Sequence, residues 1–421
     1  MKTKITLFML LPGRRDRRGS GGGGMRGLAL AVLGLSFFAR PALSAAAPRA
    51  PEAAGGKEWT IMVFLNGKND LESFALKDMN EMETVGSSDR INIVVELGRM
   101  AGYDSSDGDW QSVRRYLVKK DNDPKRIASA VLRELGKADM GDWRRLADFG
   151  KWAKAAYPAR KYMLIVWNHG TGWDKSRAPD GAKGISYDDE TGSHIDTPQL
   201  GMALREIGGV DVYGSDACLM QMPEVAYEIV DYAEYIVGSE EIEPNDGYPY
   251  NVFLGALAAA PGMDAAELAR TVVDTYGDHY LQAGKSSTQS MLKPSLLGGY
   301  AALVDDFVKA TLAADEKGLV RAAAYGAQNY AGYDNRDMWH FLQLYSAATG
   351  NEAVRARARA LQSYISGALI VHNRTTGKFT DGNSRGLAVY LPAYYFDKYY
   401  GELAWAKDTR WDDLVKWYLS K

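Results

Sequence analysis

The chain has 421 residues, of which 46% are hydrophobic and 24% charged, so it is longer than a typical single domain and can bury a large core. Residues 1–44 carry eight of the 50 basic and one of the 53 acidic residues, so the remainder has a net charge near −10. That charge argues against nucleic acid as a partner, because phosphate binding needs basic patches, and it suits an exported protein that acts on cationic substrates.

The first 44 residues are expected to be a signal peptide. An arginine after Met25 precedes an apolar stretch at 28–38, and Ala42–Ala45 offers small residues for cleavage. The stretch is about half of the roughly 20 residues that a membrane span needs, so we expect no permanent transmembrane helix. The arginine-rich and glycine-rich residues further upstream suggest that translation starts at Met25; the alternative is a long leader of twin-arginine character.

Downstream, apolar β-favouring runs alternate with helical spacing. Strands are predicted at 59–65, 91–97, 114–118, 162–167, 210–214 and 235–239. Helices are predicted at 71–84, 123–135, 142–156, 197–207 and 222–230. Asp123-Pro124 and Thr197-Pro198 each fit an N-cap followed by a proline in the first helical position. This alternation predicts an α/β fold with a mostly parallel sheet flanked by helices.

After Gly247 the pattern becomes mainly helical, with helices expected at 264–282 and 352–371. A last strand at 386–391 either returns to the sheet or builds a small second one. We therefore expect a disordered Ala/Pro/Gly-rich linker over 45–57, a core domain over 58–250 and a helical elaboration over 251–421.

The single cysteine, Cys218, and His169 each follow an apolar run that reads as a buried strand. Because ligands bind at the carboxyl ends of parallel strands, the two residues have the placement of a nucleophile and its general base. A helix predicted just after Cys218 would lower the thiol pKa and supply backbone N–H donors. The alternatives are a buried structural cysteine and a hydrogen-bonded structural histidine. Neither metal-ligand spacing nor a phosphate-binding loop is evident.

Four acidic residues lie near these runs. Asp216 precedes the thiol by two residues and is either a turn residue or a pocket carboxylate that selects Lys or Arg side chains. Glu240, Glu241 and Glu243 follow the next strand, and we expect at least two of them to lie on a solvated rim.

The blocks Asn168-His169-Gly170-Thr171-Gly172-Trp173 and Asp216-Ala217-Cys218-Leu219-Met220 resemble the two signature blocks of the clostripain family of cysteine peptidases. Further similar segments, which extend the resemblance over about 58–421, are Trp59–Val63 with Asn69-Asp70-Leu71, Glu243–Gly247, Gly386–Pro392 and Trp411–Leu414. The resemblance implies a caspase-like fold shared with gingipains, legumains and separase.

The resemblance also implies roles for individual residues. His169 would be the base, Cys218 the nucleophile, and the backbone amides of Gly170 and Cys218 the oxyanion donors. Asp216 would select arginine, with lysine as the second candidate. Self-cleavage is implied in the polar segment 174–197, where Lys175, Arg177 and Lys183 are the candidate sites. Some members need calcium, for which Asp188, Asp189 and Glu190 offer oxygen ligands, although no metal is expected to be required.

The residues together with the resemblance imply an exported cysteine endopeptidase, periplasmic or extracellular, that acts as a monomer on proteins and peptides with basic residues. Two alternatives stay open. The first is a non-enzymatic binding protein on the same fold, and the second is a cysteine acyltransferase or amidase that uses the same two residues.

Overall fold

The computed structural model describes residues 56–173, 184–331 and 334–421. The predicted signal peptide, all but the last two residues of the predicted linker, and Lys175, Arg177 and Lys183 lie outside these ranges. The described residues belong to one compact unit, which spans residues 46–421. None of the helices in these ranges is long and apolar enough to cross a membrane.

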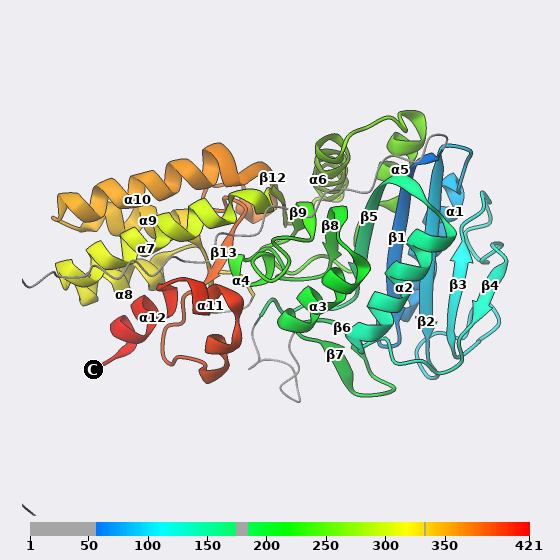
Figure 1. Cartoon of the computed structure of the whole chain (residues 1–421), viewed down its shortest axis with the longest axis horizontal. Helices are drawn as coiled ribbons and strands as arrows, with labels where there is room; N and C mark the ends of the chain where they lie inside the picture. Colours follow the sequence, from blue (N-terminus) through cyan, green and yellow to red (C-terminus); the bar gives the residue numbers. More distant parts are fainter. Residues whose placement is uncertain (1–55, 174–183, 332–333) are drawn as a thin grey trace, which may run out of the picture. The chain divides into compact units, whose positions relative to one another are not determined.

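A nine-stranded sheet runs through the described chain (Figure 1). Across the sheet the order is β12 (Ile370–Thr376), β10 (Ser287–Leu292), β9 (Ala233–Gly238), β8 (Val210–Asp216), β5 (Ala159–Trp167), β1 (Lys57–Gly67), β2 (Ile91–Arg99), β3 (Val113–Leu117) and β4 (Val131–Glu134). The five strands from β9 to β2 are parallel, and antiparallel strands extend the sheet at both edges. The predicted mostly parallel sheet is confirmed.

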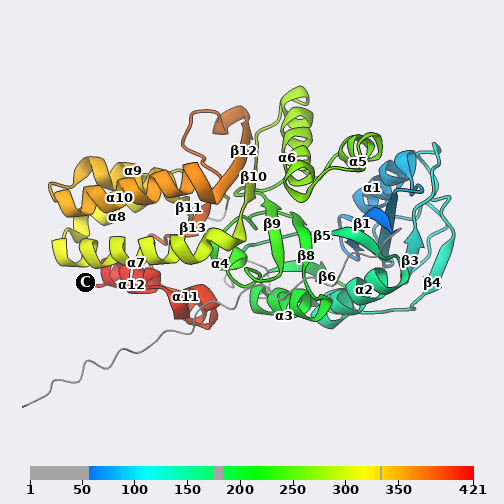
Figure 2. The ribbon, with the colours of Figure 1, turned by 45° about the horizontal axis from the view of Figure 1, so that its top comes forward.

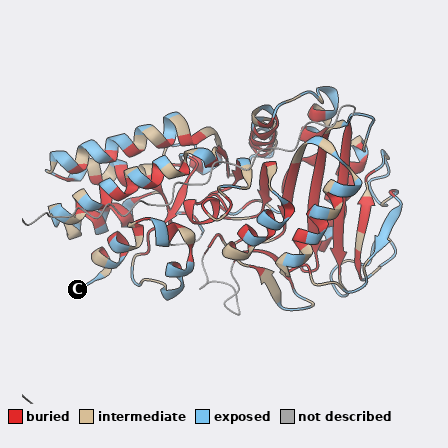
Figure 3. Cartoon of the chain, in the orientation of Figure 1, coloured by how far each residue is buried: buried red, intermediate tan, exposed pale blue. Residues whose placement is uncertain are grey.

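Helices cover both faces of the sheet (Figure 2). The helices α1 (Glu72–Val85), α5 (Tyr250–Ala259) and α6 (Ala265–Gln282) lie on one face, and α2 (Trp143–Ala156) and α3 (Thr197–Ile207) lie on the other. Side chains alternate along β1, so Ile61 and Val63 join the core under α1 while Met62 and Phe64 join the core under α2. A strand buried on both faces needs apolar residues at every position, which explains its continuous apolar run (Figure 3).

The second half of the chain adds a helical layer beside the sheet (Figure 1). It contains α7 (Leu297–Ala314), α8 (Lys317–Gly326), α9 (Met338–Ala348), α10 (Glu352–Tyr364), α11 (Ala404–Asp408) and α12 (Trp411–Leu419). The strand predicted at 386–391 is β13 (Ala388–Tyr390), which pairs with β11 (Asn335–Asp337) in a small second sheet. Two strands that the sequence did not reveal, β10 and β12, join the main sheet instead.

The predicted helix over 123–135 is wrong. The segment forms turns that lead into β4, which pairs with β3. The carboxylate of Glu83 accepts hydrogen bonds from the backbone N–H groups of Ala128 and Ser129, at 3.1 and 2.7 Å. These distant acceptors take donors that a helix would use internally, so tertiary contacts override the local capping signal.

Two other predicted helices differ in their limits, and a third differs in its N-cap. The helix expected at 352–371 ends at Tyr364, passes through a π-helical turn and becomes strand β12, which therefore contains His372. The helix expected at 222–230 is the single turn α4 (Pro223–Ala226). Helix α3 is capped by Asp196 rather than Thr197, in a reciprocal pair with Gln199.

Candidate active site

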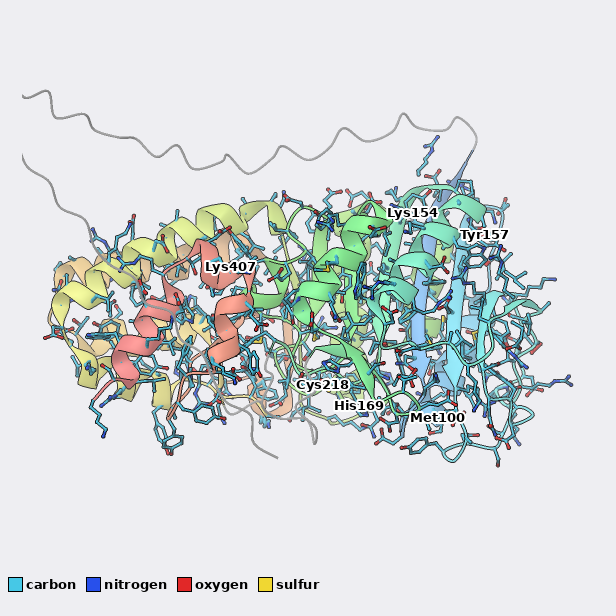
Figure 4. The ribbon with its side chains drawn as sticks, turned by 60° about the horizontal axis from the view of Figure 1, so that its bottom comes forward. Met100, Lys154, Tyr157, His169, Cys218 and Lys407 are labelled. Atoms are coloured by element: carbon cyan, nitrogen blue, oxygen red, sulfur yellow. The ribbon has the colours of Figure 1, made fainter. Side chains whose placement is uncertain are left out.

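The ends of β5 and β8 bring His169 and Cys218 together. In the parallel register of these neighbouring strands Trp167 pairs with Asp216, and each of the two candidate residues lies two positions further along its chain. Figure 4 shows both side chains at this edge of the sheet. The expectation that two strand ends meet at one edge is confirmed by this register.

Asparagine side chains fix the loop that carries His169. The amide of the buried Asn168 donates to the carbonyl oxygen of Asn66 at 2.6 Å and accepts from the backbone N–H of Tyr187 at 2.7 Å. Asn66 itself donates to the carbonyl oxygen of Tyr187 at 3.0 Å. These bonds connect the end of β1 and the loop after β5 to the short strand β6 (Ile185–Asp188), so the loop that carries His169 is held in place.

A carboxylate from the loop after β1 contacts the imidazole. Nε2 of His169 lies 2.7 Å from Oδ1 of Asp70. Nε2 donating to this carboxylate would leave Nδ1 as the unprotonated nitrogen that can accept a proton. Asp70 had no role among the residues predicted for the site. The available signal was topological, because β1 is the parallel neighbour of β5 and its carboxyl end meets the same edge.

The surroundings of Cys218 favour the neutral thiol over the thiolate. Burial raises its pKa, while the backbone N–H groups of Glu243, Cys218 and Gly170 lower it by pointing at the sulfur, and the Glu241 carboxylate raises it. The net effect is an elevated pKa, so a thiolate forms only when a base takes the proton. The helix predicted here was expected to lower the pKa. The turn that replaces it is too short to outweigh burial.

The backbone around the thiol is tightly packed. A Cβ on Gly170 would collide with the carbonyl oxygen of Cys218, so only glycine allows this approach of the two loops. Leu219 has a φ of 65°, a conformation rare for residues with a side chain. Its N–H donates to the carbonyl oxygen of Glu241 at 3.2 Å. The backbone N–H groups of Gly170 and Cys218 are directed at the sulfur.

Asp216 is buried beneath the turn that follows β9, with 4% of its surface exposed. It accepts from the backbone N–H of Tyr248 at 3.2 Å and from the hydroxyl of Tyr250 at 2.8 Å. Burial raises its pKa to about 6, against hydrogen bonds from Glu243, Tyr250 and Tyr248 that lower it. The carboxyl of Glu243 has a pKa raised by burial and by the charge of Asp216, so the two groups hold a proton between them.

The expected solvated rim is wrong, because Glu240, Glu241 and Glu243 are at most 7% exposed. Glu240 accepts from the backbone N–H of Gly386 at 3.0 Å. Glu241 accepts from the N–H groups of Ile242 and Ala331, each at 2.9 Å. Backbone donors from the second half of the chain thus replace water around two of these carboxylates, a contact between distant segments that the local sequence does not reveal.

The acidic residues offered for calcium have protein partners. The ammonium of the buried Lys68 lies 2.8 Å from Asp188 and 2.9 Å from Glu190, and Tyr103 donates to Asp189 at 2.8 Å. In the described ranges, no group of three or more His, Cys, Asp or Glu side chains could hold a metal ion. These contacts give Asp188 and Glu190 a structural role at the loop beside the site.

The segment between the histidine and cysteine blocks is only partly described. Its described part, from Gly184, contains a hairpin of β6 and β7 (Ser193–Ile195), and Ser186 and Asp188 in β6 are buried. This part of the polar segment 174–197 is therefore a folded hairpin with buried residues and is not an exposed loop. The candidate cleavage residues Lys175, Arg177 and Lys183 lie outside the described residues.

Comparison with known proteins gives consistent matches. A model of the clostripain family matches residues 63–417. Clostripain from Hathewaya histolytica is 28% identical over 224 residues, which cover 48% of this chain and 43% of that protein, less than half its length.

Two solved structures have a similar fold. A secreted C11 cysteine protease from Bacteroides thetaiotaomicron, in complex with an irreversible peptide inhibitor, superposes with a TM-score of 0.66 at 20% identity, covering 85% of this chain and all of that one. An inactive zymogen C11 protease from Parabacteroides distasonis gives 0.61 at 17% identity, covering 85% and 99%. At these identities the likeness establishes a common fold.

Proposed function

Because the chain belongs to the clostripain family, we propose that it is an exported cysteine endopeptidase that cleaves peptide bonds after arginine, with lysine as the second candidate. The observation that carries the proposal is the equal placement of His169 and Cys218 after the paired residues Trp167 and Asp216. This register puts an imidazole and a thiol at one sheet edge, with backbone N–H groups directed at the sulfur.

The reaction proceeds by acyl transfer to sulfur. Nδ1 of His169 takes the proton of the Cys218 thiol, and the sulfur attacks the carbonyl carbon of the scissile bond. The N–H groups of Gly170 and Cys218 hold the negative charge on the carbonyl oxygen. His169 then gives its proton to the leaving amine, which departs as the C–N bond breaks. Water, deprotonated by the same imidazole, hydrolyses the thioester and restores the thiol.

Asp70 acts through His169 as a positioning residue. Its carboxylate, 2.7 Å from Nε2, orients the ring and stabilises the imidazolium that forms during the attack. This help matters because the elevated thiol pKa makes proton transfer the step that creates the nucleophile.

Asp216 is proposed as the carboxylate that selects the basic side chain. A guanidinium would replace the proton that Asp216 shares with Glu243, and would form charge-assisted hydrogen bonds in its place. Gly247 covers the carboxylate, since a Cβ there would lie 2.9 Å from Oδ1. An arginine side chain can reach Asp216 only when the turn at 244–248 moves, so substrate binding and turn movement are coupled.

Self-cleavage is proposed after Lys175, Arg177 or Lys183. These are the lysine and arginine residues of the segment 174–197, and the remainder of that segment is held in the hairpin and the cap of α3. A protease that accepts arginine or lysine can cut only after such residues. Export is proposed on the leader-like first 44 residues.

Hydrolysis of fluorogenic peptide amides that end in arginine or alanine tests the proposal. The wild type should cleave the arginine peptides, and Cys218→Ala should have only background activity with an unchanged circular dichroism spectrum. Equal activity in the two proteins would refute the proposed nucleophile. Cleavage of the alanine peptide at the same rate would refute the specificity.

A further inference from the structure

A cavity of about 730 Å³ lies between the turn after β9 and the second half of the chain. Its lining includes the apolar or aromatic residues Ile242, Pro244, Tyr330 and Phe379 and the cationic residues Lys285 and Lys378. A volume of this size is typical of pockets that receive a small molecule or a few side chains. The reaction proposed above does not use the cavity.

The cavity begins next to the nucleophile. The backbone N–H of Glu243 points at the Cys218 sulfur, and the residues on each side of it, Ile242 and Pro244, line the cavity. Because an extended chain advances about 3.4 Å per residue, a bound peptide reaches the cavity two or three residues away from the scissile bond.

The strand order decides which end of the substrate lies there. His169 must give its proton to the leaving amine, so the part of the substrate after the scissile bond lies on the β5 side of Cys218. The acyl part extends in the opposite direction, over the ends of β9 and β10. The cavity is lined by residues that follow β9 and precede β10, so it lies on the acyl side.

The lining favours a large apolar side chain. Ile242 is 49% exposed, and the rings of Tyr330 and Phe379 lie 5.9 Å apart. Both lysines are near acidic partners, with Lys285 at 3.2 Å from Asp246 and Lys378 at 3.7 Å from Glu241. Since these acids balance the two cations, the cavity offers no excess charge to an acidic side chain. Lys378 also lies 4.7 Å from the centre of the Phe379 ring.

We propose that this cavity is a specificity subsite that binds a large apolar or aromatic side chain two or three residues before the scissile bond. The inference rests on the proposed peptidase function. It adds a second determinant of specificity, so that efficient substrates carry both the basic residue at the cleavage site and an apolar residue upstream.

Peptide amides of 7-amino-4-methylcoumarin test this subsite. The set is acetyl-Xaa-Gly-Arg and acetyl-Gly-Xaa-Arg, with Phe, Leu, Asp or Gly as Xaa. In the wild type, Phe or Leu at one of the two positions should raise kcat/KM at least about tenfold over Gly, as expected for filling an apolar pocket. Two variants should lower the ratio of kcat/KM for the Phe peptide to kcat/KM for the Gly peptide. Ala331→Trp fills the cavity from its exposed border, and Ile242→Ala removes apolar lining.

In both variants the Phe-to-Gly ratio should fall to within about threefold, with the glycine peptide still cleaved. Val252→Ala is the matched control, because Val252 is 48% exposed and lies outside the cavity, so its ratio should stay at the wild-type value. Equal cleavage of all peptides by the wild type, or a preference for Asp, overturns the subsite and leaves the peptidase function intact. No cleavage of any arginine peptide overturns the proposed function itself.

Discussion

At the scale of single residues, the site depends on contacts between side chains that lie far apart in the sequence. Asp70 and His169 are 99 positions apart and meet because β1 and β5 are parallel neighbours. Asp216 and Glu243 meet because the turn after β9 folds over the end of β8. In each pair one group changes how the other ionises or is oriented, so the chemistry belongs to the pair.

Asp70→Asn should lower kcat about tenfold and leave KM nearly unchanged, because the residue orients the base and does not contact substrate. We expect only this modest decrease in kcat because the Asp70 side chain is 66% accessible to water, which weakens its electrostatic effect on His169. Asp89→Asn, in the turn before β2 at the opposite end of the strands, is the control. A rise in KM without a change in kcat would assign Asp70 to substrate binding instead.

Asp216→Asn should remove the preference for arginine over citrulline, an uncharged side chain of the same shape. In the wild type this preference should increase as the pH rises through about 6, because burial holds Asp216 protonated below that pH. The ratio of kcat/KM for the two peptides isolates this effect from the titration of the base. In the variant the ratio should be low and independent of pH. A pH-dependent preference that survives in the variant would place the selecting carboxylate elsewhere.

The preference for arginine should increase with pH, whereas the contribution of Asp216 to the free energy of unfolding should decrease with pH. A folded-state pKa of about 6 against a usual value of 3.8 means that the Asp216 contribution is fully present below 3.8 and is lost as the pH rises through about 6. Thermal unfolding of the wild type and of Asp216→Asn at pH 4 and pH 8 checks this sign. The variant should be at its largest disadvantage at pH 4.

At the scale of elements, strands that are buried on both faces can be recognised in the sequence by their apolar runs, whereas edge strands cannot. The runs 59–65, 91–97 and 162–167 are apolar at nearly every position and form β1, β2 and β5. The edge strand β4 is exposed at all four positions, and β12 continues directly from a helical turn. Pairing partners, rather than local composition, make these two segments strands.

At the scale of the whole molecule, both halves of the chain contribute to one sheet and to the cores on both of its faces. Strands β10 and β12 come from beyond residue 282 and extend the sheet formed by β1 to β5, β8 and β9. The core under α2 and α3 continues into the helical layer of α7, α9, α10 and α12. A cut between β5 and β8 would leave fragments that pair with each other through residues 163–167 and 212–216.

Intact mass measurement of the purified wild type and Cys218→Ala tests the processing. The wild type should give two fragments whose masses fix the cut after Lys175, Arg177 or Lys183, and the variant should give one chain. Both should lack the first 44 residues after export, and the native elution volume should match that of the uncut variant because the β5–β8 pairing persists. Identical fragments in Cys218→Ala would show that another protease makes the cut.

The sequence alone determined the class of fold and singled out His169 and Cys218 as the candidate site residues. Buried parallel strands need continuous apolar runs, and a lone thiol and an imidazole directly after two such runs are informative without coordinates. Tertiary structure alone decided the rest: the Asp70 contact, the burial of Glu240, Glu241 and Glu243, the loss of the helix at 123–135, and the cavity beside Ile242. Each of these depends on donors, acceptors or surfaces that come from distant segments, and local sequence patterns do not reveal such partners.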